Sequence, residues 1–224
     1  LIPLLFWVTD RLAVERRWMD AIPMGLVVDS MLLGGFPAVT VYAIYAAVAY
    51  FFVRAIGAGE SARHVLMSLV RSGAGVILAV MVSAVQILPF VWFSTHYVDF
   101  EARSFNGHLD SSALTTAIVP RMFGNPDAPL SQPNHFIESF SYIGAASLIL
   151  VVAAILVRPR RTRPAGVTTF FALALVLVGA AVYFGGVAFD LLHLLPAVGS
   201  SPVGRMRAIL GFFVAILAAL GAAA

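Results

Sequence analysis

The chain has 224 residues, of which 61% are hydrophobic and only 11% are charged, and its formal net charge is +3. A soluble domain usually carries about 25% charged residues, so this composition excludes an ordinary water-soluble globule and indicates a membrane protein. The chain has no cysteine, which excludes disulfides and thiolate metal sites.

Apolar stretches recur along the chain at lengths that suit a membrane. A helix needs about 20 predominantly apolar residues to cross the hydrocarbon core. Five stretches qualify and a sixth runs to the last residue, near residues 20–35, 37–56, 68–93, 139–157, 166–186 and 205–224. Backbone groups must be paired inside lipid, so we expect helices. The sequence therefore predicts an all-α, polytopic transmembrane helix bundle, with residues 1–224 forming one transmembrane region.

The segments between these stretches have distinct expected roles. Residues 10–20 mix apolar and charged side chains, which predicts an interfacial helix or the end of an earlier span. Glycine and proline at residues 34–37 predict a tight reversal. The polar region near residues 94–138 predicts a long outer loop with a short helix from Ser111 to Val119, capped by Asp110 or Ser111. The chain begins at Leu1 and ends in an apolar run, so we expect an internal fragment of a longer protein.

The arginines divide unequally between the two sides of this predicted bundle. If the spans alternate, ten arginines face one side and four face the other. The ten are Arg11, Arg16, Arg17, Arg54, Arg63, Arg71, Arg158, Arg160, Arg161 and Arg163, and the four are Arg103, Arg121, Arg205 and Arg207. The positive-inside rule then predicts that the ten lie on the cytoplasmic side of the cell membrane. This distribution explains the positive charge without a nucleic-acid partner.

Four segments in chain order resemble motifs of the YfhO-like bacterial membrane proteins, which belong to the GT-C type of polytopic glycosyltransferases. They are Leu33–Pro37 with Tyr42; Ala84–Pro89; Val119–Gly124 with Glu138–Gly144; and Leu194–Pro196 with Arg205–Arg207. Phe36 and Ala38 depart from the Gly-His-Pro-Gln pattern of the family. The resemblance implies transfer of sugar from a polyprenyl-phosphate donor at the outer face. It also implies a catalytic acid in the first outer loop, a region expected to precede Leu1.

Two carboxylates are candidates for catalysis. Asp29 lies inside an apolar stretch, where an ionised side chain is costly and often functional. The alternative is that Asp29 pairs with a neighbouring helix or with water. Glu138 precedes a predicted span, so it either lines the site or caps that helix through the N-terminal dipole.

Four further side chains are candidates for substrate binding. Arg205 and Arg207 begin a helix on the predicted outer side, where guanidinium groups suit a lipid phosphate. Contact with ordinary phospholipid headgroups is the alternative. His193 and Gln86 are expected near the same membrane face, in a polar outer cavity. The loop acids and histidines lack a recognised metal-ligand spacing, so we expect no metal cofactor, with a divalent cation as the alternative.

The leading hypothesis is therefore a membrane glycosyltransferase-like protein. Its expected partners are membrane lipids, a polyprenyl-phosphate sugar and further segments of the same chain. A lipid or glycolipid transporter is the first alternative, although the predicted spans carry few polar side chains besides Asp29. A non-catalytic subunit of a membrane assembly is the second alternative.

Overall fold

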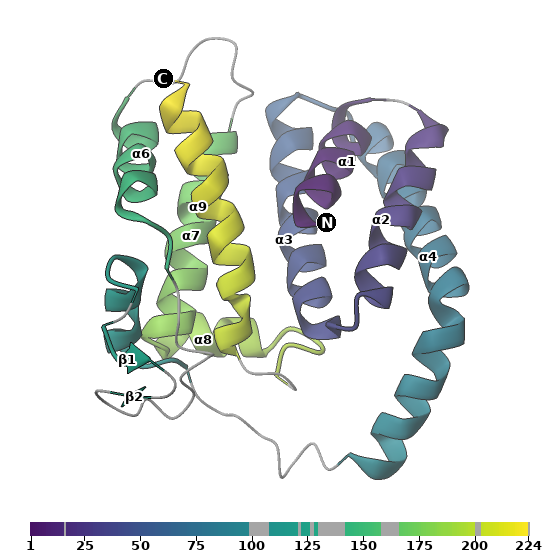
Figure 1. Ribbon diagram of the computed structural model, residues 1–224. Helices are drawn as coiled ribbons and strands as arrows, with labels where there is room; N and C mark the ends of the chain where they lie inside the picture. The colour runs from purple at the N-terminus through teal and green to yellow at the C-terminus, as the bar shows by residue number, and fades with distance from the viewer. Residues whose placement is uncertain are drawn as a thin grey trace. The chain divides into compact units, whose positions relative to one another are not determined.

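The computed structural model describes most of the chain as helix (Figure 1). The residues described are 1–15, 17–98, 108–120, 122–125, 128–129, 142–157, 166–199 and 203–223. They divide into two compact units, Leu1–Arg103 with Pro164–Val167, and Ser104–Arg163 with Thr168–Ala224. Strand structure in the described residues is confined to a two-residue antiparallel pair, β1 Gly124–Asn125 and β2 Ala128–Pro129. The prediction of an all-α protein is confirmed.

The first unit consists of four α-helices and one short 3-10 helix. These are α1 Ile2–Val14, η1 Trp18–Asp20, α2 Ala21–Leu33, α3 Pro37–Gly57 and α4 Ala62–Tyr97 (Figure 1). The predicted reversal at residues 34–37 is confirmed, because α2 ends at Leu33, Gly35 has a φ of 74°, and α3 begins at Pro37. Glycine adopts that backbone conformation without the steric cost of a side chain.

Small residues let α2 and α4 approach closely. A row of small buried residues on α4 includes Ser68, Gly75, Ala79 and Ser83. A Cβ atom on Gly75 would lie 2.6 Å from the carbonyl oxygen of Ala21 on α2, which is well inside normal contact. Helices in membranes commonly pack through such small-residue interfaces, because the helix backbones can then touch.

The described part of the second unit contains two 3-10 helices and four α-helices. Its helices are η2 Ser111–Ala117, α6 Ala145–Leu156, α7 Val167–Tyr183, α8 Gly186–His193, η3 Val203–Met206 and α9 Arg207–Ala222. Helices α6 and α9 pack against each other. Aromatic side chains join α7 to α9, with the rings of Phe171 and Phe213 5.7 Å apart between centroids. The core of this unit is therefore built from α6, α7 and α9.

The helix lengths differ from the six predicted spans. Three described helices are long and apolar enough to cross a membrane: α3 with 21 residues, α4 with 36, and Val203–Ala222 with 20. Helices α7 and α8, which bend by 97°, make a fourth if they count as one span. Helix α2 has 13 residues and α6 has 12. At 1.5 Å per residue these reach only about 20 Å and 18 Å, against about 30 Å of hydrocarbon.

The fifth predicted span ends earlier than the sequence indicates. Hydropathy alone predicted one helix through residue 186, but α7 ends at Tyr183. Gly185, which precedes α8, and Gly186, its first residue, have φ angles of 70° and 62°, which lie outside the right-handed helical range and interrupt the helix between α7 and α8. The N–H of Leu109 donates a 2.7 Å hydrogen bond to the carbonyl of Val182, so the segment before η2 satisfies one terminal carbonyl of α7.

The short helix predicted inside the polar loop is confirmed at Ser111–Ala117, as a 3-10 helix. Helix α4 extends to Tyr97, so the polar loop begins later than the predicted residue 94. Asp110 is the cap, because its Oδ1 accepts a 2.8 Å hydrogen bond from the backbone N–H of Ser112. That hydrogen bond holds the pKa of the Asp110 carboxyl below its usual value of 3.8.

This cap predicts a local dependence on pH. The folded pKa is depressed, so the cap stabilises η2 above pH 3.8 and is lost as the pH falls through the folded pKa. We expect the Ser112 amide to exchange faster with solvent as the pH falls from about 5 to about 2 beyond the intrinsic pH effect. Hydrogen exchange by NMR measures this change. Asp110→Ser is the control, because a serine cap does not titrate; an identical pH profile in both proteins would contradict the prediction.

Candidate functional site

A large apolar pocket lies within the second unit. Its volume is about 840 Å³, and four parts of the chain line it. The segment of η2 and its C-cap contributes Leu114, Ala117 and Ile118, and the approach to α6 and its first turn contribute Tyr142, Ile143 and Leu148. Helix α7 and the residue after it contribute Leu175, Val176, Gly179, Ala180, Tyr183 and Phe184. Helix α9 contributes Arg207, Ala208, Leu210, Gly211 and Val214. Small-molecule sites are typically concave, mostly apolar and furnished with a few polar groups, and this pocket has that character.

Arg207 is the only charged residue among the described residues that line this pocket. It is the first residue of α9, and its side chain is half-buried. The Nε atom donates a 2.9 Å hydrogen bond to the carbonyl of Gly204, which orients the guanidinium at the start of the helix. Because an arginine stays protonated at all physiological pH values, the pocket carries a permanent positive charge at one place in an apolar wall.

This combination of surfaces suits an amphipathic anion. A guanidinium group donates several hydrogen bonds in a plane and binds phosphate or carboxylate oxygens in pairs. The apolar walls favour hydrocarbon over water. Two tyrosines, Tyr142 and Tyr183, add hydroxyl groups to the lining. The pocket can therefore hold a ligand that has an anionic head and an apolar body.

The two other candidates in this unit do not line the pocket. Arg205 lies in η3, two residues before Arg207, and is half-buried. His193 ends α8, and its ring stacks on Phe189 with centroids 4.3 Å apart. The Nε2 atom of His193 is buried and has no hydrogen-bond partner among the described residues. The apolar pocket therefore includes Arg207 but neither Arg205 nor His193, and the polar outer cavity stays a prediction.

The remaining candidates lie elsewhere in the chain. Asp29 belongs to the first unit, where its Oδ1 accepts a 2.5 Å hydrogen bond from the fully buried hydroxyl of Ser83. This bond joins α2 to α4, as expected if Asp29 pairs with a neighbouring helix. Gln86 is exposed on α4, and its Nε2 donates to the carbonyl of Leu33 at 3.5 Å. Glu138 lies outside the described residues.

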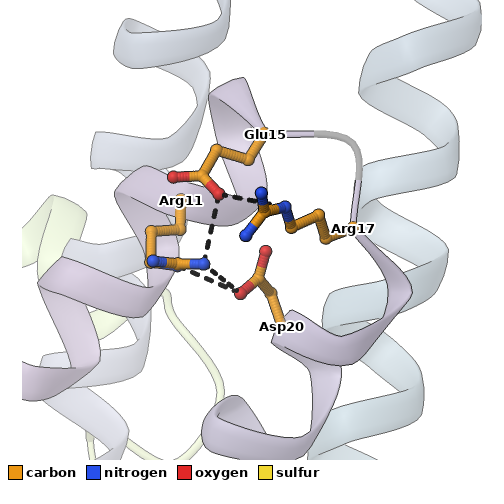
Figure 2. Close-up of polar contacts among 4 residues, drawn as sticks. All are labelled: Arg11, Glu15, Arg17 and Asp20. Carbon is orange, nitrogen blue, oxygen red and sulfur yellow. Dashed lines mark hydrogen bonds and ion pairs between the residues drawn. The ribbon is translucent and has the colours of Figure 1, made fainter.

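Sequence reasoning missed a network of charges in the first unit. Figure 2 shows Arg11 between two acids. Its Nη2 atom lies 3.1 Å from Glu15 Oε2 and 2.9 Å from Asp20 Oδ1. Arg17 lies 3.9 Å from the same Glu15 oxygen. The network joins the end of α1 to the start of α2. The equal mixture of charges in residues 10–20 was visible in the sequence, but the pairing was not.

A second pairing missed from the sequence joins α1 to α3. Asp10 accepts hydrogen bonds from the side chains of Arg54 and Tyr50, and the distance from Tyr50 Oη to Asp10 Oδ1 is 2.9 Å. Tyr50 and Arg54 are four residues apart, so they share a helix face, and this spacing was a signal available in the sequence. Asp10 is 40 residues away, and only the packing of α1 on α3 brings it to them.

Metal ligands do not gather in the part of the chain that the structure describes. No three His, Asp or Glu side chains there lie close enough together to hold an ion.

No family model, curated protein or solved structure matches the chain.

Proposed function

We propose that this protein spans the cell membrane several times, with α3, α4 and Val203–Ala222 among its spans. The support comes from their length and apolar composition. Only 11% of the most apolar stretch of α4 is buried within the protein. Its large apolar side chains are exposed along most of the helix, as at Leu66, Ile77, Met81, Val85 and Leu88. An apolar surface of that extent is unfavourable in water and favourable in lipid.

The polar and aromatic residues of α4 support one depth in the membrane. Arg71 and Trp92 are 21 residues apart, which is about 31 Å along a helix and matches the thickness of the hydrocarbon core. Beyond Trp92, the rings of Trp92 and Phe93 pack with those of His96 and Tyr97 at 5.0 to 5.6 Å. Aromatic side chains concentrate at both membrane interfaces, so the cluster marks one end of the span, and the arginines Arg63 and Arg71 near the other end favour the cytoplasmic face for that end.

The pocket of the second unit supports a lipid-phosphate substrate. The observation that carries this proposal is the position of Arg207 in an otherwise uncharged apolar pocket of about 840 Å³. A polyprenyl-phosphate sugar has an anionic phosphate and a long apolar chain, which match the guanidinium and the walls. Together with the resemblance to GT-C type enzymes, this favours a glycosyltransferase that uses such a donor at the outer face.

In the proposed transfer from this donor, the bond that forms is matched by a bond that breaks. An acceptor oxygen bonds to the anomeric carbon of the sugar, the bond from that carbon to the phosphate oxygen breaks, and the acceptor proton passes to a carboxylate. Arg207 holds the phosphate and stabilises the charge left on it. Asp29 and Glu138 stay predictions for the carboxylate, and a carboxylate upstream of Leu1 stays the expectation from the resemblance.

Replacing Arg207 tests the binding step. We expect Arg207→Gln to weaken binding of a polyprenyl phosphate to the purified protein about tenfold or more, because a charge-assisted hydrogen bond is lost in an apolar pocket. Native mass spectrometry or a fluorescent polyprenyl phosphate measures the affinity. Arg205→Gln is the matched control, since Arg205 does not line the pocket. Equal binding by the wild type and Arg207→Gln would overturn the proposed site.

A second assay separates the enzyme from its alternatives. Full-length protein in lipid vesicles is given a labelled polyprenyl-phosphate sugar and candidate acceptors, and both transfer and movement across the bilayer are measured. Sugar transfer that Arg207→Gln abolishes supports the enzyme. Movement of the lipid without transfer supports the transporter, and binding without either supports the non-catalytic subunit.

A further inference from the structure

Arg71 is a buried cation of the first unit that the proposed function does not use. It lies in the third turn of α4 and is 8% exposed. Its Nε and Nη1 atoms are buried and have no hydrogen-bond partner among the residues that the structure describes. The guanidinium carbon lies 5.3 Å from the ring centroid of Trp18, so the indole face is the neighbour of this charge.

An uncompensated guanidinium is costly in this position. Burying an ion without a partner destabilises the folded protein even after the surroundings relax. A cation over an indole ring recovers only part of that loss. Asp20, two residues after Trp18, already accepts a hydrogen bond at its Oδ1 from Arg11 Nε, and Arg11 Nη2 lies 2.9 Å from the same oxygen. The Oδ2 atom of Asp20 has no partner in the described residues. The charge of Arg71 therefore calls for an anion that the described chain does not provide.

The Nε and Nη1 atoms of Arg71 are covered, and the side chain beside the guanidinium, Trp18, is 53% exposed. A headgroup therefore reaches the guanidinium when the exposed Trp18 ring moves aside. The side chain of Arg17 is 70% exposed on the same stretch of chain. In the described residues on either side of Trp18, Arg11 and Arg17 balance Glu15 and Asp20, and Arg71 adds one positive charge beside Trp18. An exposed tryptophan next to arginines is typical of the interface between lipid headgroups and hydrocarbon.

We propose that Arg71 binds the phosphate of an anionic phospholipid in the cytoplasmic leaflet, with Trp18 beside the glycerol region and Arg17 as a second, exposed cation. Arg71 supplies the paired N–H groups that a phosphate accepts. The positive surroundings favour a lipid with net negative charge over a zwitterionic one. This lipid is a structural ligand and is separate from the Arg207 pocket. The inference rests on the membrane placement proposed above and not on the sugar donor.

The test compares how different lipids bind to and stabilise the protein at one protein concentration. The full-length protein, purified in a neutral detergent, is titrated with phosphatidylglycerol, with phosphatidylcholine and with inorganic phosphate. Native mass spectrometry measures the bound lipid, and thermal unfolding measures the melting temperature. We expect phosphatidylglycerol alone to stay bound and to raise the melting temperature. Arg71→Gln should weaken that binding about tenfold, while Arg71→Lys should keep part of it because the charge remains.

Two controls keep the result interpretable. Arg63→Gln removes an exposed arginine from the same end of α4 and should bind phosphatidylglycerol like the wild type. Without lipid, Arg71→Gln should be at least as stable as the wild type, because it removes an unpaired buried charge. A loss of stability in Arg71→Gln that is the same with and without lipid would indicate an internal partner such as Asp20 and overturn the proposal. Equal stabilisation by inorganic phosphate would also overturn it, since the site would then take a free anion.

The two proposals fail in different ways. If Arg71→Gln loses phosphatidylglycerol while Arg207→Gln still binds polyprenyl phosphate, the lipid site stands and the pocket assignment falls. If Arg207→Gln loses the polyprenyl lipid and Arg71→Gln binds phosphatidylglycerol normally, the pocket stands and the Arg71 site falls. Recovery of the protein in the soluble fraction of cells, without detergent, would overturn both, because both rest on the membrane placement.

Discussion

Replacing Asp10 with alanine is expected to lower the free energy of unfolding by about 3 kcal/mol, because it leaves a buried arginine without its anion. The Arg54 side chain is only 9% exposed and depends on Asp10, which also accepts a hydrogen bond from Tyr50. Breaking a buried ion pair from one side usually costs about 3–5 kcal/mol. We expect the lower end of that range, because the Asp10 side chain is 38% exposed and partly screened.

Equilibrium unfolding in mixed micelles, followed by circular dichroism, measures this loss. Glu15→Ala is the matched control, since Glu15 is also an acid at the end of α1 but its ion pair with Arg11 is more exposed, at 40% and 27%. Such a pair contributes less than about 1 kcal/mol. The double variant Asp10→Ala with Arg54→Met should recover most of the loss, because no buried charge is then left unpaired. Similar effects of Asp10→Ala and Glu15→Ala would refute the assignment.

Replacing Gly75 with alanine is expected to destabilise the first unit by about 2 kcal/mol, within the usual range for an overpacked contact. The added methyl group would meet the carbonyl oxygen of Ala21 at 2.6 Å and the side chain of Met24 at 3.0 Å. A backbone carbonyl cannot move aside without shifting the whole helix. The α2 and α4 helices must therefore separate, which loses contacts along their interface.

Gly73 provides the control two residues away on the same helix. A Cβ atom there has no neighbour within 4 Å, so Gly73→Ala adds no clash. It should leave stability unchanged or raise it by up to about 1 kcal/mol, because alanine favours helix over glycine. Thermal unfolding of the two variants under identical conditions makes the comparison. The prediction fails if Gly75→Ala is as stable as Gly73→Ala.

Local patterns in the sequence predicted several features correctly. The reversal between α2 and α3 follows from Gly34, Gly35 and Pro37, which act within a few residues. The short helix after Asp110 follows from an acceptor side chain placed before a run of small residues. The apolar stretches that form α3 and Val203–Ala222 were also predicted, because their composition alone favours helix in an apolar medium.

The lengths of the other helices could not be predicted from such local patterns. A hydropathy window does not detect where a helix stops inside an apolar run. Helix α7 ends at Tyr183 because Gly185 and Gly186 take positive φ angles and Leu109 bonds to the last turn. Leu109 is more than 70 residues before Val182 in the chain, so the end of α7 depends on a tertiary contact.

In the candidate site, too, some features follow from the sequence and others only from the tertiary structure. The sequence by itself determined that Arg207 begins a helix in an apolar region, and that residue types suited to phosphate lie there. Only the tertiary structure decided that Arg207 lines the pocket while Arg205 does not, that Asp29 bonds to Ser83, and that Asp10 meets Arg54. Helix formation depends on neighbours within one or two turns, whereas each of these contacts joins side chains of different helices. Such contacts follow from packing, which no local spacing in the sequence encodes.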